Sequence, residues 1–202
     1  MKKIIIIEDV FKEFERIKSI IDGVYICPQQ YTKNDFDSGV QGSFINKLTN
    51  SLKITCTTKE EYEEQEKIKK ELQTELKNYC DENDEPVYLI DYKLDGSGKT
   101  SIINGIRFKD TFLDEMYPDK IIPVLFITSV NYDDKLNVED YVKKTNDKTI
   151  CDYQTKPNSN GWNRVQDSVR HFIDNAQLKP RKQIVNNDQP KNGIPDEEAK
   201  KI

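Results

Sequence analysis

The sequence has little of what several common kinds of functional site require. It contains a single histidine, His171, and its four cysteines are widely scattered without a CxxC pair. We therefore expect no zinc site, and we expect the thiols to be reduced, as is usual in cytosolic proteins. The longest purely aliphatic run covers only residues 4–7, which is too short for a membrane span or a secretory signal. These absences predict a cytoplasmic protein with no membrane association.

An excess of basic charge is also missing. The chain has 31 Lys and Arg against 36 Asp and Glu, which gives a formal net charge of -5. Nucleic-acid binding depends largely on neutralising phosphates with Lys and Arg. No helix-turn-helix candidate with basic residues follows the last apolar helix. We therefore expect no direct binding to nucleic acid.

What the sequence does contain is a regular alternation of strand-like and helix-like apolar segments. Short buried strands are predicted at residues 3–7, 87–90, 123–127 and 149–154, with one more at either 24–27 or 52–56. Amphipathic helices are predicted at about residues 10–21, 58–81, 105–116, 133–146 and 162–176. This alternation predicts an α/β fold, a doubly wound five-stranded parallel sheet with helices on both faces. Residues 1–178 form this domain, and residues 179–202, with three prolines and no aromatics, are predicted to be a disordered tail.

Polar side chains follow four of the predicted strands. Glu8 and Asp9 come after the first strand, Asp91 after the third, Thr128 after the fourth and Lys156 after the fifth. Because ligands bind at the carboxyl ends of parallel strands, we expect these residues to form one site. Three carboxylates together repel one another, and Mg²⁺ is the natural counter-ion for such oxygen ligands. With a hydroxyl and an ammonium group beside them, the set predicts phosphoryl transfer to a carboxylate.

These strand-end residues, in this order along the chain, resemble those of the receiver domain of two-component response regulators. The resemblance covers residues 2 to about 177. The family has an acidic pair after the first strand, a phospho-accepting Asp after the third, Thr or Ser after the fourth and Lys-Pro after the fifth. The resemblance implies that Glu8, Asp9 and Asp91 bind Mg²⁺ together with the backbone carbonyl of Lys93. It implies that Asp91 is the phosphoacceptor.

The same resemblance implies roles for the remaining residues and for partners. Thr128 and Lys156 would contact the phosphate oxygens, and Tyr153, three residues before the lysine, would form a switch with Thr128. The phosphoryl donor would be a histidine kinase or a phosphotransfer protein. Since no output domain is predicted, the chain would be a single-domain response regulator that signals through contact with a downstream protein. It would not be a conventional enzyme, beyond its own phosphorylation and dephosphorylation.

Two features depart from the family pattern. Asp91 lies 82 residues after Asp9, which predicts an insertion within about residues 28–80. The loop after Asp91 is also expanded, by residues 95–100, and it borders the expected acceptor.

Other functions were weighed against these residues. The Gly98–Lys99–Thr100 sequence suggests a nucleotide-binding P-loop, but that motif requires a glycine at position 93, which is lysine. Lys93 also argues against a haloacid-dehalogenase-like hydrolase, which has a second Asp two residues after its nucleophile. The alternative that stays open is a pseudo-receiver, an adaptor of the same fold that is not phosphorylated.

Overall fold

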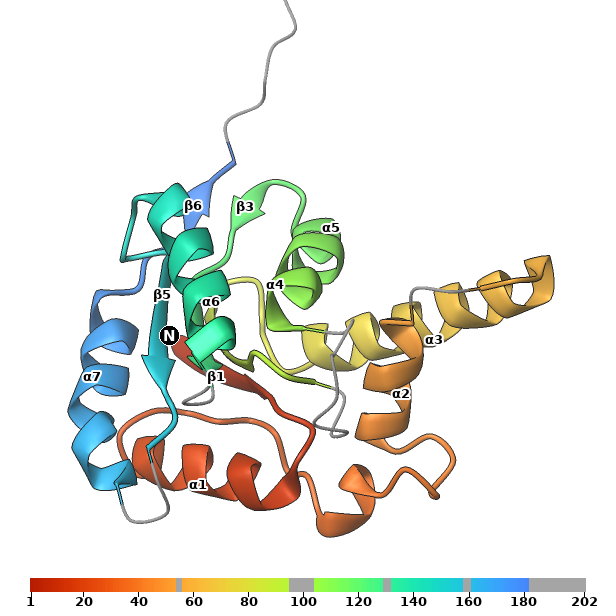
Figure 1. Ribbon diagram of the computed structural model, residues 1–202, viewed down its shortest axis with the longest axis horizontal. Coiled ribbons are helices and arrows are strands. Elements are labelled where there is room, and N and C mark those ends of the chain that lie inside the picture. Colours follow the sequence, from red (N-terminus) through yellow and green to blue (C-terminus); the bar gives the residue numbers. More distant parts are fainter. Residues whose placement is uncertain (54–55, 95–103, 129–131, 158–160, 182–202) are drawn as a thin grey trace, which may run out of the picture.

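Strands and helices alternate along the chain (Figure 1), as the apolar pattern predicts. The computed structural model describes residues 1–53, 56–94, 104–128, 132–157 and 161–181. The elements are β1 (Lys2–Ile7), α1 (Phe11–Ile21), the 3-10 helix η1 (Lys33–Phe36), α2 (Phe44–Ser51), α3 (Lys59–Lys77), β2 (Glu85–Asp91), α4 (Gly105–Phe108), the π-helical turn η2 (Lys109–Leu113), α5 (Asp114–Met116), β3 (Lys120–Ile121), β4 (Val124–Thr128), α6 (Tyr132–Thr145), β5 (Cys151–Thr155), α7 (Trp162–Asn175) and β6 (Lys179–Pro180).

The main sheet is parallel and has the strand order β1-β2-β4-β5. This confirms the predicted α/β class and the parallel sheet. The predicted second strand at residues 24–27 is reduced to a single parallel bridge between Lys3 and Ile26, in which the Ile4 N–H donates to the Ile26 carbonyl at 2.8 Å. The ladder formed by the described residues therefore has four strands. For the other candidate at 52–56, residues 54–55 lie outside the described part of the chain.

The side chain of Gln29 completes the edge of β1 where a second strand would have paired. Gln29 is fully buried, its Oε1 accepts from the Ile6 N–H at 2.6 Å, and its Nε2 donates to the Ile6 carbonyl at 2.9 Å. Pro28 precedes it and has no N–H to donate, so it cannot continue a backbone ladder. The amide of Gln29 thus replaces one peptide group of the missing strand.

We expect Gln29→Glu to destabilise the fold by about 2 kcal/mol, because the Ile6 carbonyl loses its donor and a carboxyl group replaces a satisfied buried amide. Urea unfolding at pH 7 measures this. Gln30→Glu is the matched control. The Gln30 side chain is exposed, so this substitution should change the free energy of unfolding little. Equal stability of the two variants would contradict the role given to the Gln29 amide.

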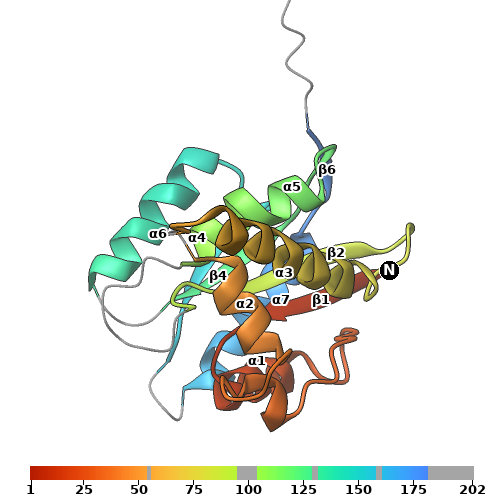
Figure 2. The same cartoon turned by 90° about the vertical axis from the view of Figure 1, so that its right-hand side faces the viewer.

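The strands alternate their side chains between two hydrophobic clusters, one on each face of the sheet. One cluster packs against the helices from α2 to α6. Its strand residues are Ile5, Ile7, Tyr88, Ile90, Val124, Phe126 and Cys151. The other packs against α1 and α7; its strand residues are Ile4, Ile6, Val87, Leu89, Leu125 and Ile127. Figure 2 shows α1 on one side of β1 and β2, and α5 on the other. Both faces are therefore covered, which explains why the strands are apolar throughout.

Residues 28–80 contain η1, α2 and α3, between the Ile26 bridge and β2. A capping box begins α3: the Thr58 hydroxyl accepts from the Glu61 N–H, and the Glu61 carboxylate accepts from the Thr58 N–H. Only Leu72 and Leu76 of this helix are buried. Its N-terminal part projects from the body (Figure 1), and Tyr62 in that part is 56% exposed.

The first residues of the predicted tail belong to the folded part of the chain. Lys179 and Pro180 pair antiparallel with β3. Lys179 also forms an ion pair with Asp147, and Arg181 forms one with Asp114. Residues 179–181 are therefore not part of a disordered tail, and residues 182–202 lie outside the described part. Of the helices in the described residues, none has the length and apolar character that crossing a membrane would require.

Candidate functional site

Three buried carboxylates meet where β1 and β2 end. Ile7 is in register with Ile90, so the residues that follow them, Glu8 and Asp91, are neighbours across the two strands. One oxygen from each of Glu8, Asp9 and Asp91 can be chosen so that all three lie within 4.8 Å of one another. The exposed fractions are 0% for Glu8, 8% for Asp9 and 5% for Asp91. Oxygen ligands at this spacing could hold a hard divalent cation.

Lys156 brings a positive charge into this cluster from a third strand. Its backbone N–H donates to the Thr128 carbonyl at 2.6 Å, which places it directly beyond β5 beside the end of β4. Its Nζ lies 3.0 Å from Glu8 Oε2 and 3.0 Å from Asp91 Oδ1. The lysine therefore bridges the two strand-end carboxylates.

The turn into α1 holds Glu8 in place from the other side. Glu8 Oε1 accepts from the backbone N–H groups of Asp9 and Val10, each at 3.2 Å. One carboxylate oxygen of Glu8 is thus used by the main chain and the other by Lys156. Three donor atoms therefore orient the Glu8 carboxylate, which is fully buried.

The pKa values of the bridged groups reflect this crowding. Burial, together with repulsion from Asp91 and Asp9, holds the pKa of Glu8 well above its ordinary value despite the attraction of Lys156. Burial raises the pKa of Asp91 to about 6, against the lowering effect of Lys156. Burial alone would lower the pKa of Lys156, but Glu8 and Asp91 outweigh it and the pKa lies above the usual lysine value. The two carboxylates thus favour the charged form of the Lys156 ammonium.

These shifts predict a pH dependence of stability in the metal-free protein. Asp91 ionises near pH 3.8 in the unfolded chain and at about 6 in the fold, so between these values the folded state holds the extra proton. Unfolding then releases a proton, and stability falls as the pH rises from about 4 to about 6. We expect a loss on the order of 2 kcal/mol over this window in urea titrations with EDTA. Asp91→Asn should reduce this loss and leave the part that comes from Glu8, whose pKa is also raised, and an undiminished slope in that variant would contradict the assignment.

The other residues of the expected site lie on the neighbouring strands. Thr128 is the last residue of β4 and is fully buried. Tyr153 lies on β5 in register with Phe126, packs at the border of the first cluster and is partly buried. Lys93 follows Asp91 by two residues and forms an antiparallel bridge with Asn104. The roles of Thr128 and Tyr153 as a switch, and of the Lys93 carbonyl as a ligand, stay predictions.

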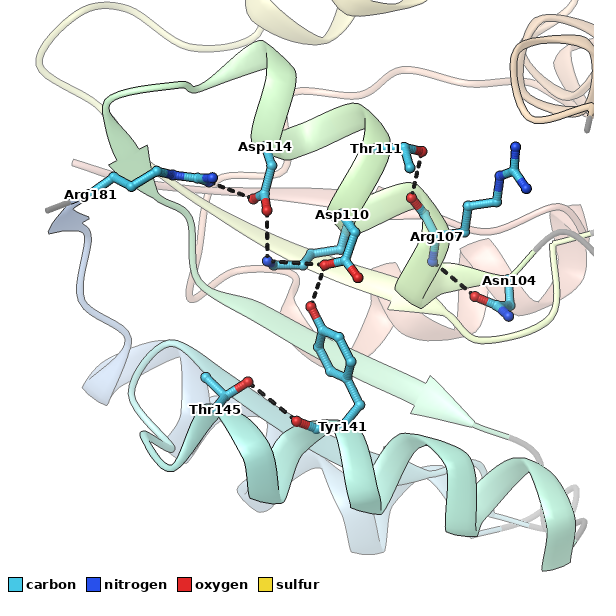
Figure 3. Close-up of polar contacts among 9 residues, drawn as sticks. Asn104, Arg107, Asp110, Thr111, Asp114, Tyr141, Thr145 and Arg181 are labelled. Carbon is cyan, nitrogen blue, oxygen red and sulfur yellow. Dashed lines mark hydrogen bonds and ion pairs between the residues drawn. The ribbon is translucent and has the colours of Figure 1, made fainter. Parts of the chain in front are cut away.

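A short helical segment, residues 105–116 (α4, η2 and α5), packs behind Asp91. Asn104 caps it, with its Oδ1 accepting from the Arg107 N–H at 2.9 Å (Figure 3). The Gly105 N–H donates to the Tyr92 carbonyl at 2.9 Å, so this segment is hydrogen-bonded to the end of β2. Residues 95–103, which include the glycine-rich Gly98–Lys99–Thr100 sequence, lie outside the described residues.

Ion pairs anchor the far side of this segment to α6 and to the chain after β6. Lys109 Nζ lies 3.1 Å from Asp114, which also pairs with Arg181 at 2.8 Å. The Tyr141 hydroxyl of α6 donates to Asp110 (Figure 3). This network could not be predicted from the sequence, because its members are common surface residue types spread over 73 positions and only the fold brings them together.

No family model, curated protein or solved structure matches the chain.

Proposed function

We propose that this protein is a receiver-type response regulator that accepts a phosphoryl group on Asp91. The observation that carries the proposal is the Lys156 bridge. Of three buried carboxylates at two adjacent strand ends, Glu8 and Asp91 share one ammonium group from a third strand. Three carboxylates beside one lysine can bind a further cation. Carboxylate, lysine and metal cation together are groups that phosphoryl transfer uses.

Asp91 suits the role of acceptor better than Glu8 does. Both oxygens of Glu8 are already used, by Lys156 and by two backbone N–H groups. Glu8 is also fully buried with its pKa far above the usual range, whereas Asp91 has a pKa of about 6 and is ionised at neutral pH. An ionised carboxylate is the nucleophile that the reaction needs.

In the proposed reaction an Asp91 carboxylate oxygen attacks the phosphorus of the donor. A new P–O bond forms while the bond from phosphorus to the donor breaks. With phosphohistidine as donor, the electron pair of that P–N bond returns to the imidazole nitrogen, which can then take up a proton. Lys156, 3.0 Å from Asp91 Oδ1, is placed to balance the charge on the phosphoryl oxygens. Mg²⁺, when bound by Glu8, Asp9 and Asp91, would supply further positive charge.

The strand order of the sheet also supports the proposal. Counting the Ile26 bridge as a vestigial strand, the order across the sheet is Ile26, β1, β2, β4, β5. This corresponds to the flavodoxin-like order 2-1-3-4-5. With helices packed in both hydrophobic clusters, we infer a doubly wound, receiver-type sheet whose second strand has nearly disappeared.

Phosphorylation would be transmitted through the β4–β5 side of the sheet. A phosphoryl group adds about 1.5 to 2 negative charges and three acceptor oxygens. We infer that Thr128 and Lys156 contact these oxygens and that Tyr153, beside α6, repacks in response. A histidine kinase or phosphotransfer protein would be the donor, and a downstream protein in the cytoplasm would read the change.

One observation favours a second function, that of an adaptor which is never phosphorylated. Asp91 is only 5% exposed, so a donor has little direct access to it in this conformation. Beryllium fluoride, which mimics a phosphoryl group on a carboxylate, separates the two functions. A receiver should show a protein-bound ¹⁹F resonance that requires Mg²⁺ and disappears with EDTA. A wild-type protein that binds no beryllium fluoride at saturating Mg²⁺ would support the adaptor.

A further inference from the structure

We propose that Gly105 is a positioning residue for Asp91, because its missing side chain lets the helical segment 105–116 pack directly on the end of β2. The acceptor role of Asp91 rests on the proposed function, but the packing does not. A Cβ atom built on Gly105 would lie 2.6 Å from the Asp91 carbonyl oxygen and 2.8 Å from Ile90 Cγ2. Both distances are shorter than real Cβ contacts, so any other residue here requires a shift.

The backbone conformation does not explain the glycine. The described glycines with positive φ are Gly23 and Gly42, and Gly105 is not among them. Gly105 is also the first residue of a helix, where alanine is preferred over glycine by up to about 1 kcal/mol. Helix propensity alone would therefore favour alanine at this position. The glycine is needed only because Asp91 and Ile90 occupy the space.

The helical segment cannot easily move away from the strand. Phe108 and Phe112 are buried and stack with their ring centroids 4.6 Å apart. On the far side, Asp110 accepts from the Tyr141 hydroxyl and Asp114 pairs with Arg181 (Figure 3). Displacement caused by a side chain at position 105 should therefore fall on the end of β2. That strand end carries the Asp91 carboxylate.

A small shift of Asp91 matters because its partners are fixed. Lys156 Nζ is 3.0 Å from Asp91 Oδ1, and the same ammonium is tied to Glu8. Sites of this kind require their groups to be held within about 0.5 Å of the productive geometry. Gly105 thus acts through Asp91, by setting where the carboxylate meets Lys156 and the other two carboxylates.

The test compares Gly105→Ala with Gly39→Ala. Gly39 is exposed, has no positive φ, and a Cβ there meets only the Asp37 side chain, at 3.2 Å. Calorimetry with Mg²⁺, at a temperature where circular dichroism shows both variants folded, should give an affinity about tenfold weaker for Gly105→Ala. Gly39→Ala should match the wild type.

A second readout requires neither metal nor phosphoryl transfer. In metal-free protein, the ¹⁵N resonance of the Lys156 ammonium should move in Gly105→Ala toward its position in Asp91→Asn, in which the ion pair is broken. If Gly105→Ala is too unstable, the same resonance is compared in the Asp9→Asn background, where less carboxylate repulsion should raise stability. If the wild-type protein binds Mg²⁺ but takes up no phosphoryl group, the proposed function is contradicted, whereas the positioning role of Gly105 is not. If the Lys156 resonance and the Mg²⁺ affinity of Gly105→Ala both equal those of the wild-type protein, the positioning role of Gly105 is contradicted, even if the variant is less stable.

Discussion

Asp91→Asn will remain folded but take up no phosphoryl group from acetyl phosphate. The amide keeps the size of the side chain but is not a nucleophile, and it removes one charge from the buried cluster of three carboxylates. We expect complete loss of the covalent adduct and a large fall in Mg²⁺ affinity, together with equal or higher stability of the metal-free protein. Intact mass spectrometry and thermal unfolding with EDTA measure these effects.

Asp152→Asn provides the matched control for this experiment. Asp152 lies on β5, three residues before the strand ends, and its carboxylate accepts only from the adjacent Tyr153 N–H among the hydrogen bonds of the described residues. This variant should take up a phosphoryl group like the wild type. An adduct of the same mass and hydroxylamine sensitivity on Asp91→Asn would show that another residue is the acceptor.

Lys156→Met will destabilise the metal-free protein by about 3 kcal/mol at pH 7, because it leaves Glu8 and Asp91 buried without their cation. The loss should shrink at pH 5, because Asp91 can then hold a proton and less buried charge is left unpaired. Burial already raises the pKa of each, and removing the lysine raises both further. Urea unfolding at the two pH values tests the effect and its sign.

Lys143→Met is the control for the lysine. Lys143 pairs with Glu139 on the surface of α6 at 3.1 Å, and its side chain is 66% exposed against 18% for Lys156. Exposed pairs of this kind contribute less than about 1 kcal/mol. If Lys156→Met were no more destabilising than Lys143→Met, or equally destabilising at both pH values, the bridge would not hold the cluster together.

The assembly of the site could be predicted because a parallel sheet fixes where its strands end. Glu8 and Asp91 each end an apolar run and Lys156 follows the last predicted strand of the sheet, so the parallel register places them at one edge. The sequence pattern supplied the strands, and the geometry of parallel pairing supplied the contact. No information from distant parts of the chain was required.

The second strand could not be predicted, because its hydrogen bonds come partly from a side chain. Val24 to Cys27 has the pattern of a strand, but only Ile26 bridges to β1, and Gln29 satisfies Ile6 instead. Pro28 was the one local signal that the ladder would stop. The number of strands thus depended on a tertiary contact that composition and periodicity do not encode.

The environments of Gly105 and Tyr62 also depend on tertiary contacts that the sequence pattern does not encode. The Asn104–Gly105 pair was recognisable as a helix start, but the closeness of Gly105 to Asp91 exists only once the segment is packed. Tyr62 fits the apolar stripe of α3, yet that part of the helix projects beyond the layer that would cover it. Helical periodicity predicts a face but not whether a partner lies opposite.

The central claim, that Asp91 accepts a phosphoryl group, is tested most directly by mapping the adduct on the wild-type protein. The protein is incubated with acetyl phosphate and Mg²⁺, digested, and its peptides are analysed by mass spectrometry, with an EDTA-treated sample alongside. We expect one phosphoryl group on the peptide that contains Asp91 and none in the presence of EDTA. An unmodified Asp91 peptide at saturating donor and Mg²⁺, or a phosphoryl group found only on another peptide, would contradict the claim.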